Sequence, residues 1–135
     1  MNQSEKRQFL IQSLLKERPE YRDLSIQAES ESQRQLLRGL MNIRAPRRMD
    51  AEFLKTQDEY LQAETAAKGI TDIDDLTPVQ PRLYLWQGDI TTLRCDAIVN
   101  AANSGMTGCY IPNHRCIDAP IPPPMATQIK IFVRA

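Results

Sequence analysis

The sequence has no excess charge of either sign and no long hydrophobic run. Its 17 basic and 17 acidic residues cancel, so no long-range field favours phosphate backbones or anionic membranes. No apolar stretch approaches the roughly 20 residues that a membrane-spanning helix needs. Residues 1–8 are polar and do not resemble a signal peptide. We therefore expect no nucleic-acid partner, no membrane partner and a cytoplasmic location.

The sequence is also poor in cysteine and histidine. It contains three cysteines, Cys95, Cys109 and Cys116, and a single histidine, His114. Because all three cysteines lie late in the chain and cannot all pair within it, a secreted disulfide framework is disfavoured. Their clustering favours metal or thiol chemistry. Cys95 stands apart from the other two and is expected to be a small core residue.

Residues 1–69 contain three segments with helical spacing. Asn2 with Glu5, and Ser30 with Gln33, have the spacing of capping boxes, and Asp50 is suited to cap the third segment. Apolar residues recur on one face of each segment and are expected to pack as a core. They are Leu10, Ile11, Leu14, Leu15, Leu36, Leu37, Leu40, Met41, Phe53, Leu54, Tyr60 and Leu61.

Two further features of this helical region lead to expectations. Gly69 follows the third segment and is suited to the left-handed conformation that often ends a helix. The basic cluster of Arg44, Arg47 and Arg48 is expected to be a solvated turn.

After residue 69 the sequence changes character. Residues 70–82 are rich in aspartate and punctuated by proline, which is typical of a connection. Residues 83–86 then predict a strand, and the apolar residues 97–102 predict a strand buried on both faces. Strands of that kind belong to parallel sheets covered by helices, so the pattern predicts an α/β layer.

The last residues do not continue this pattern. Four prolines lie within residues 120–124, and they exclude a helix interior or a central strand there. Only residues 128–133 remain for one more strand. We expect a sheet of two or three strands with one uncovered face.

Two motifs lie at the ends of the expected strands. Gly88-Asp89-Ile90-Thr91 precedes the run Ala97-Ile98-Val99-Asn100-Ala101-Ala102-Asn103-Ser104. In open α/β sheets, ligands bind beyond the carboxyl ends of strands, where Asp89 and Asn103 are expected to lie. The alternative is that Asp89 caps a turn and Asn103 only terminates a strand.

The pair of motifs resembles the opening of a macrodomain, the fold that binds ADP-ribose. The resemblance implies that Asp89 accepts a hydrogen bond from the adenine amino group and that the backbone of Ile90 lines the same end. It also implies that Asn103 contacts the distal ribose, where the scissile bond lies, as a catalytic residue.

A third motif, Cys109-x4-His114-x-Cys116, combines two thiols and an imidazole, which match the ligand preference of zinc. Three ligands leave one tetrahedral position open, as in catalytic zinc sites, although Asp118 is an available fourth ligand. The alternatives are a disulfide between the two cysteines, or two buried thiols beside a surface histidine.

This motif is similar to the zinc loop of the zinc-dependent branch of macrodomains, which hydrolyse mono-ADP-ribose from protein side chains. The resemblance implies Zn²⁺ as cofactor, held by Cys109, His114 and Cys116. It implies ADP-ribose and a mono-ADP-ribosylated protein as partners. Zinc would either orient the ribose or polarise an attacking water, and the sequence does not choose between these roles.

The predicted fold class is α/β: a macrodomain-like but incomplete fold, preceded by an N-terminal three-helix region. We expect a helical region at 1–69, a linker at 70–82, a partial macrodomain with its zinc-binding loop at 83–118, and a divergent proline-rich tail at 119–135. The resemblance ends after Asp118, so we expect a truncated chain with weak or no hydrolase activity. The alternative function is a noncatalytic helical interaction module with a structural zinc knuckle.

Overall fold

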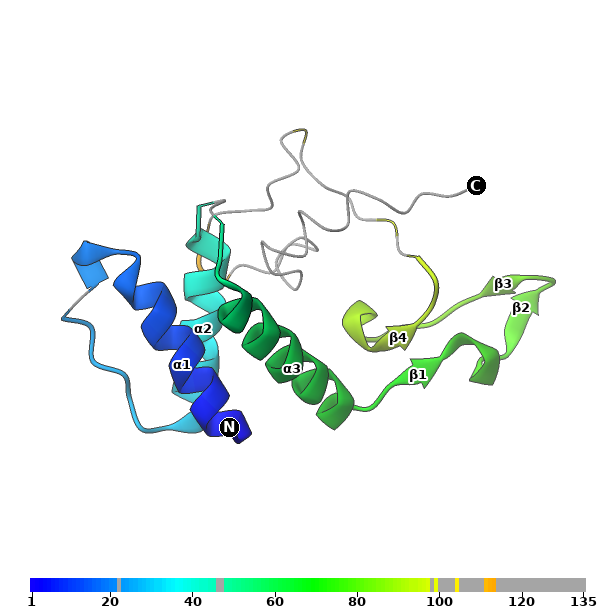
Figure 1. The fold of residues 1–135 in the computed structure, drawn as a ribbon. Coiled ribbons are helices and arrows are strands. Elements are labelled where there is room, and N and C mark those ends of the chain that lie inside the picture. Colours follow the sequence, from blue (N-terminus) through cyan, green and yellow to red (C-terminus); the bar gives the residue numbers. More distant parts are fainter. Residues whose placement is uncertain (22, 46–47, 98, 100–103, 105–110, 114–135) are drawn as a thin grey trace.

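The computed structural model describes residues 1–21, 23–45, 48–97, 99, 104 and 111–113. These residues form three α-helices, followed by short strands and 3-10 turns (Figure 1). The helical elements are α1 (Gln3–Lys16), η1 (Pro19–Tyr21), α2 (Ser30–Ile43), α3 (Ala51–Lys68), η2 (Ile73–Asp75) and η3 (Ile90–Thr92). The strands are β1 (Thr71–Asp72), β2 (Pro78–Gln80), β3 (Leu83–Tyr84) and β4 (Leu93–Arg94).

Helix α1 begins with the predicted capping box. The backbone N–H of Glu5 donates to Asn2 Oδ1 over 2.9 Å, and the backbone N–H of Asn2 donates to Glu5 Oε2 over 2.8 Å. Two N–H groups that would otherwise lack a helical partner are satisfied in this way. The predicted start of the first helix is confirmed.

The predicted cap of α2 is wrong. Glu29, not Ser30, is the N-cap residue, and the described residues supply no side-chain hydrogen bond to this helix end. Gln33 is buried and serves a tertiary contact instead, because its side-chain amide donates to the carbonyl of Gln27 over 2.8 Å and accepts from Arg7 Nε over 3.0 Å. A buried amide must be satisfied where it lies, and this requirement outweighs a capping role at the surface.

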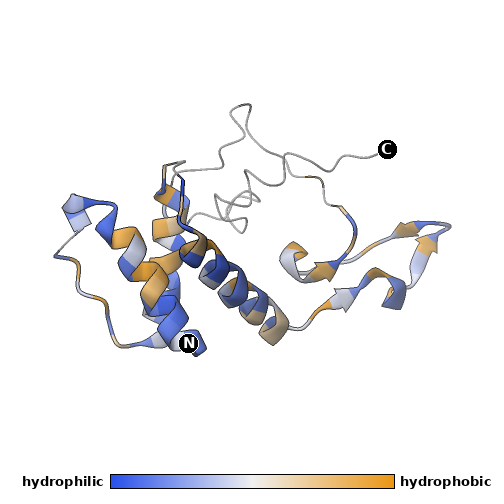
Figure 2. Ribbon diagram, in the orientation of Figure 1, coloured by the Kyte–Doolittle hydropathy of each residue, from blue (hydrophilic) through white to orange (hydrophobic). Residues whose placement is uncertain are grey.

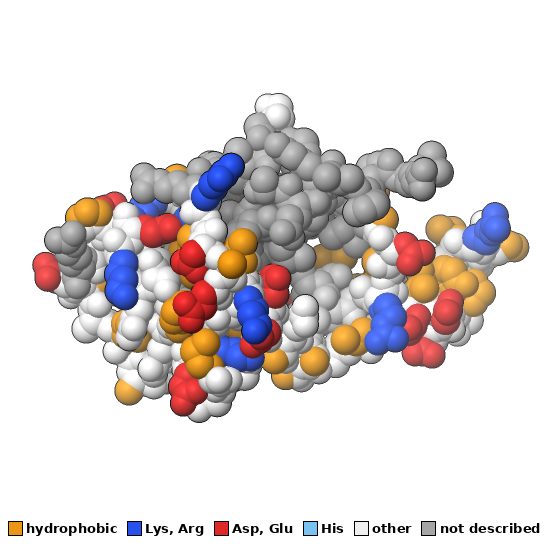
Figure 3. All heavy atoms as spheres, viewed as in Figure 1, with side chains coloured by type: hydrophobic (Ala, Val, Ile, Leu, Met, Phe, Trp, Pro, Cys, Tyr) orange, Lys and Arg blue, Asp and Glu red, His pale blue; other side chains and the backbone are white. Residues whose placement is uncertain are grey.

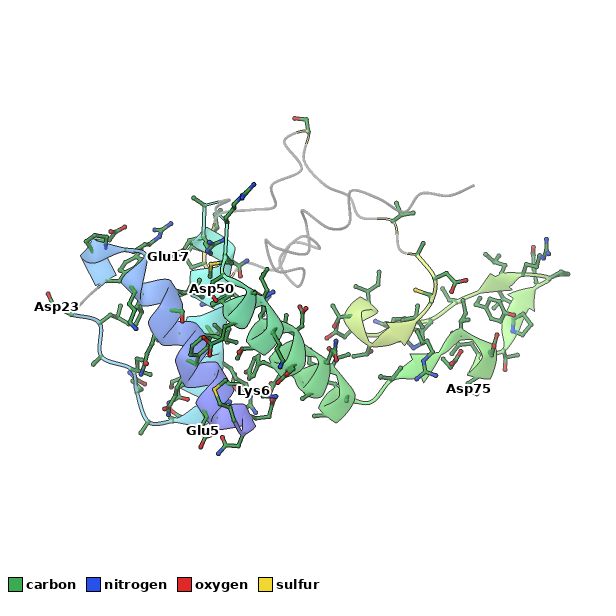
Figure 4. All side chains as sticks on the ribbon, viewed as in Figure 1. Glu5, Lys6, Glu17, Asp23, Asp50 and Asp75 are labelled. Atoms are coloured by element: carbon green, nitrogen blue, oxygen red, sulfur yellow. The ribbon has the colours of Figure 1, made fainter. Side chains whose placement is uncertain are left out.

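The predicted cap of α3 is confirmed, whereas the prediction for Gly69 holds only for the sign of its φ, because its ψ of 142° lies outside the left-handed helical region. Asp50 lies at its start (Figure 4) and accepts from the backbone N–H of Phe53 over 2.7 Å. At the other end, Gly69 has a φ of 86°, a value that side chains with a Cβ rarely adopt. The chain therefore leaves α3 directly after Lys68 and turns towards β1.

The helical core forms between α1 and its two neighbours. Helix α1 packs against both α2 and α3, and its buried apolar residues belong to the core that the three helices share (Figure 2). Phe53, Leu10 and Ile11 are almost completely buried. Leu36 and Leu61 lie partly buried against the core, whose members are Leu10, Ile11, Leu14, Leu15, Leu37, Leu40, Met41, Phe53 and Tyr60. The predicted apolar faces are confirmed, apart from Leu54, which is half-buried outside this cluster.

The expectation that the basic cluster after α2 is a solvated turn fails at Arg44. Arg44 is buried, and its guanidinium binds Glu17 through two hydrogen bonds of 2.8 and 2.9 Å. A planar guanidinium matches a carboxylate in this paired geometry, which compensates for removing both charges from water. Arg48 is exposed as predicted, and Arg47 lies outside the described residues.

The strands form two small sheets. Strand β1 pairs with β4 in parallel, and β2 pairs with β3 antiparallel. The segment 70–82, predicted as a connection, contributes β1, η2 and β2. The predicted strand at 83–86 is confirmed over Leu83–Tyr84. Helices with small mixed sheets agree with the α/β class.

The predicted strand at 97–102 is not found at its described positions. Ala97 and Val99 have no strand conformation and are exposed, Val99 by 90%. A strand buried on both faces needs neighbours on both edges and layers above and below. In the described part of the chain, the parallel sheet holds only β1 and β4, with two residues each. Residues 98 and 100–102 lie outside the described residues.

Apolar side chains are exposed at β2 and β3, in a hairpin that is not the sheet predicted from the sequence. Val79, Leu83 and Leu85 are exposed by 58%, 54% and 82%, and apolar side chains gather at that end of the molecule (Figure 3). None of the helices in the described residues is long and apolar enough to cross a bilayer.

We expect Phe53→Ala to lower the free energy of unfolding by about 3–5 kcal/mol, because it removes a buried ring from the centre of the core. Urea unfolding followed by far-UV circular dichroism measures the change. Lys55→Ala is the control, since Lys55 lies on the same helix with a side chain that is 79% exposed. A loss no larger than that of the control would contradict this account of the core.

Candidate functional site

The described part of the candidate site is the 3-10 turn η3 and the aspartate that precedes it. Asp89 Oδ1 accepts from both the backbone N–H and the hydroxyl of Thr91, over 3.0 and 2.7 Å. The Asp89 carbonyl accepts from the backbone N–H and the hydroxyl of Thr92, over 2.8 and 2.7 Å. Asp89 therefore caps a turn, and this capping fixes the direction of its carboxylate.

Gly88 allows the turn to start where it does. A Cβ at this position would lie 2.3 Å from Cζ2 of Trp86, far inside van der Waals contact. The indole therefore lies directly against the backbone that leads into Asp89. Any side chain at Gly88 would displace either the ring or the turn.

The end of α3 supplies a cation to this turn. Lys68, the last residue of α3, places its Nζ 2.8 Å from Asp89 Oδ2, and α3 and η3 are in contact. A lysine is also favourable at the C-terminal end of a helix, where the macrodipole is negative. The helical region thus contributes directly to the surroundings of Asp89.

The pairing of β1 with β4 holds Lys68 and Asp89 close to each other. Strand β1 begins two residues after Gly69, and β4 begins directly after η3. Their parallel pairing joins Thr71 with Leu93 and Asp72 with Arg94. The Arg94 guanidinium also lies 3.3 Å from Asp72 Oδ2. Both sides of the Lys68–Asp89 ion pair are therefore tethered within a few residues.

The Asp89 carboxylate is ionised, and some of its hydrogen-bond acceptor positions already have donors. The hydrogen bond from Lys68, followed by those from Thr91, lowers the pKa of Asp89 from 3.8 to about 2. An ionised carboxylate is acceptor-only, with about four lone-pair positions. The described residues fill three of them: two on Oδ1 through Thr91 and one on Oδ2 through Lys68. Among the described residues, no donor is found for the second acceptor position on Oδ2.

The remaining predicted site residues divide into two groups. Ile90 is half-buried in η3, beside Asp89, and its carbonyl accepts the backbone N–H of Leu93. Asn103, Cys109, His114 and Cys116 lie outside the described residues. The described residues hold no group of three metal-ligating side chains. The three-residue metal site therefore stays a prediction.

The expectation for Cys95 is met only in part. Its thiol is free and half-buried, and it is not a member of the helical core. It follows β4, whose sheet consists of two short strands in the described part of the chain. Among the described residues it belongs to no group of three or more metal-ligating side chains.

Sequence reasoning missed Lys68 and Trp86. Lys68 lies 21 positions before Asp89, and only the end of α3 brings them together. The sole local signal was a lysine in the last turn of a predicted helix, which the helix dipole alone explains. For Trp86, the glycine two positions later was the available signal of a close approach.

We expect Lys68→Ala to raise the pKa of Asp89 from about 2 towards 3.8, because the largest cause of its depression is removed. In the wild type, the depressed pKa contributes stability above about pH 4, and this contribution is lost as the pH falls towards 2. The variant should lose less stability across that window. A pH titration of the Asp89 carboxyl carbon by NMR measures the pKa. Lys55→Ala, from the same helix, is expected to leave it unchanged, and equal pKa values in both variants would exclude the Lys68 contact.

Comparison with known proteins gives three informative relatives, while no family model matches the chain. The chain is 53% identical over 122 residues to a protein-ADP-ribose hydrolase of Treponema medium, and the match covers 87% of this chain and 47% of that protein. It is 38% identical over 125 residues to a protein-ADP-ribose hydrolase of Staphylococcus aureus (strain MRSA252), covering 92% of this chain and 47% of that protein.

A third relative, from Fusarium oxysporum f. sp. cubense, is named a probable bifunctional ADP-ribose hydrolase/ADP-ribosyltransferase. It is 40% identical over 101 residues, covering 67% of this chain and 17% of that protein. The chain spans about half the length of the two bacterial relatives. Over most of its own length, the chain is therefore homologous to one part of proteins named protein-ADP-ribose hydrolase.

Proposed function

We propose that this chain carries the adenine-binding turn and the metal-binding segment of a macrodomain that hydrolyses mono-ADP-ribose from proteins. The observation that carries the proposal is the Asp89 turn: an ionised carboxylate, fixed in direction and exposed, with an acceptor position on Oδ2 that has no donor among the described residues. The names of the bacterial relatives support the same chemistry.

Asp89 suits the exocyclic amino group of adenine because that group is a hydrogen-bond donor and the carboxylate only accepts. A charge-assisted bond of this kind is stronger than a neutral one. The capping bonds from Thr91 do not compete with it, since they use Oδ1. Capping the turn and binding the base are therefore compatible roles, and Ile90 would line the same end.

Asn103 and the segment from Cys109 to Cys116 would serve the opposite end of the ligand. Two thiolates and an imidazole fit Zn²⁺ by donor chemistry, with Cys109, His114 and Cys116 as its ligands. Bound there, zinc would act as a Lewis acid with an open position. Asn103 would hold the distal ribose as water adds to its anomeric carbon. The bond to the protein side chain breaks, and the leaving group takes up a proton.

We expect the purified chain to bind about one zinc ion per molecule through Cys109, His114 and Cys116. Most of the metal should be lost in each of the variants Cys109→Ser, His114→Ala and Cys116→Ser, because only two protein ligands would then remain. Elemental analysis after dialysis measures the content. Cys95→Ser is the matched control and should keep its zinc. Metal retained by both loop cysteine variants, or lost only from the control, would refute the assignment.

We also expect the chain to bind ADP-ribose and Asp89→Ala to weaken that binding at least about tenfold, since a hydrogen bond to a charged group contributes about 1.5–3 kcal/mol. Isothermal titration calorimetry measures the dissociation constants. Asp75→Ala removes the same charge from the turn η2 (Figure 4) and should bind as the wild type does. A chain that binds zinc but no ADP-ribose would instead favour the noncatalytic module with a structural zinc knuckle.

A further inference from the structure

The ion pair between Lys68 and Asp89 lies at the surface. The two side chains are 54% and 41% exposed, and Lys68 Nζ lies 2.8 Å from Asp89 Oδ2. An ion pair in such a position contributes little to the free energy of folding, because water solvates both charges well when they are apart. The parallel pairing of β1 with β4 already joins the two segments. Both charged groups therefore remain accessible, and stability alone gives little reason for the pair.

The pair offers hydrogen-bond donors and an acceptor side by side. An ammonium group has three N–H donors, whereas an ionised carboxylate only accepts. Among the residues that the structure describes, Lys68 Nζ has one acceptor, Asp89 Oδ2. Two of its donors thus have no described partner, and the second acceptor position on Oδ2 has no described donor. A ligand that satisfies both groups must carry a donor next to an acceptor on one edge.

Adenine has such an edge. Its exocyclic amino group donates, and the ring nitrogens on either side of that group, N1 and N7, accept. When the amino group donates to Asp89 Oδ2, the neighbouring ring nitrogen lies on the side of the amino group from which a donor must come. The ammonium of Lys68 is a donor next to that same oxygen, 2.8 Å from it.

We infer that Lys68 is a second adenine-binding residue, which donates to a ring nitrogen, N1 or N7, beside the amino group bound by Asp89. This inference rests on the proposed adenine-binding role of Asp89. Lys68 adds specificity, because Asp89 alone accepts from any N–H group, whereas the pair requires an acceptor beside the donor. Since Lys68 is the last residue of α3, the helical region supplies one side chain of the ligand site.

A direct contact differs from an indirect effect through Asp89. If Lys68 only oriented the Asp89 carboxylate, its removal would weaken every ligand that donates to Asp89 by the same factor. If Lys68 donates to a ring nitrogen, its removal also abolishes the preference for ligands that carry this nitrogen. The test therefore compares ADP-ribose with its 1-deaza and 7-deaza analogues, in which a C–H group replaces N1 or N7.

The experiment uses isothermal titration calorimetry on the full chain as wild type, Lys68→Met and Lys55→Met. Methionine has no N–H donor on its side chain, is unbranched like lysine and is an equally good helix former. Lys55→Met is the matched control, because it makes the same change on α3 at a side chain that is 79% exposed. Far-UV circular dichroism checks that the helices are intact in both variants.

We expect Lys68→Met to bind ADP-ribose at least about tenfold more weakly than wild type, since a hydrogen bond from a charged group is lost. Lys55→Met should bind within about twofold of wild type. One of the two deaza analogues should bind wild type at least about tenfold more weakly than ADP-ribose does. The same analogue and ADP-ribose should bind Lys68→Met equally well.

The outcomes separate this inference from the function on which it rests. If wild type binds no ADP-ribose, the proposed adenine-binding turn fails, and the role of Lys68 fails with it. If wild type binds ADP-ribose and both analogues equally well, the role of Lys68 is refuted without recourse to any variant, while that of Asp89 stands. An analogue penalty that persists in Lys68→Met also refutes it. Equal or tighter binding of ADP-ribose by Lys68→Met would show that the lysine is dispensable or competes with the base for Oδ2, and either result overturns the inference.

Discussion

Phe53, Leu10 and Ile11 exclude water where α3 meets α1, and this packing sets the direction of α3. The direction of α3 in turn determines where Lys68, at the end of that helix, lies. Gly69 then turns the chain into β1, whose parallel partner β4 continues from η3. The ion pair between Lys68 and Asp89 therefore depends on a hydrophobic contact some four helical turns away. A surface ion pair contributes little free energy by itself, so the core, not the ion pair, determines where the turn lies.

Features encoded by neighbouring residues were predictable from the sequence. The caps formed by Asn2 and Asp50 and the positive φ of Gly69 each need only a few adjacent residues. The prediction failed where a distant partner competes for a side chain. The Gln33 side chain is hydrogen-bonded to Arg7, 26 positions earlier, and the Arg44 side chain to Glu17, 27 positions earlier.

The candidate site shows the same division. The turn-forming role of Asp89 follows from the hydroxyls next to it, and it was one of the two alternatives that the sequence left open. The ion pair of Lys68 with Asp89, and the cavity that Asn113 lines together with Gly39, join segments that no local pattern relates. The N-terminal helices thus lie next to the Asp89 turn and next to Asn113, which stands between Cys109 and His114 in the sequence.

The position of Trp86 has a practical consequence. It is the only tryptophan in the sequence, and its ring lies against Gly88, immediately before Asp89. The helical core contains no indole, so fluorescence excited selectively in tryptophan arises beside the η3 turn and not from the helices. The emission spectrum therefore reports the local environment of this turn without any attached dye. Rearrangement of the turn and melting of the core become two optically separable events in the same sample.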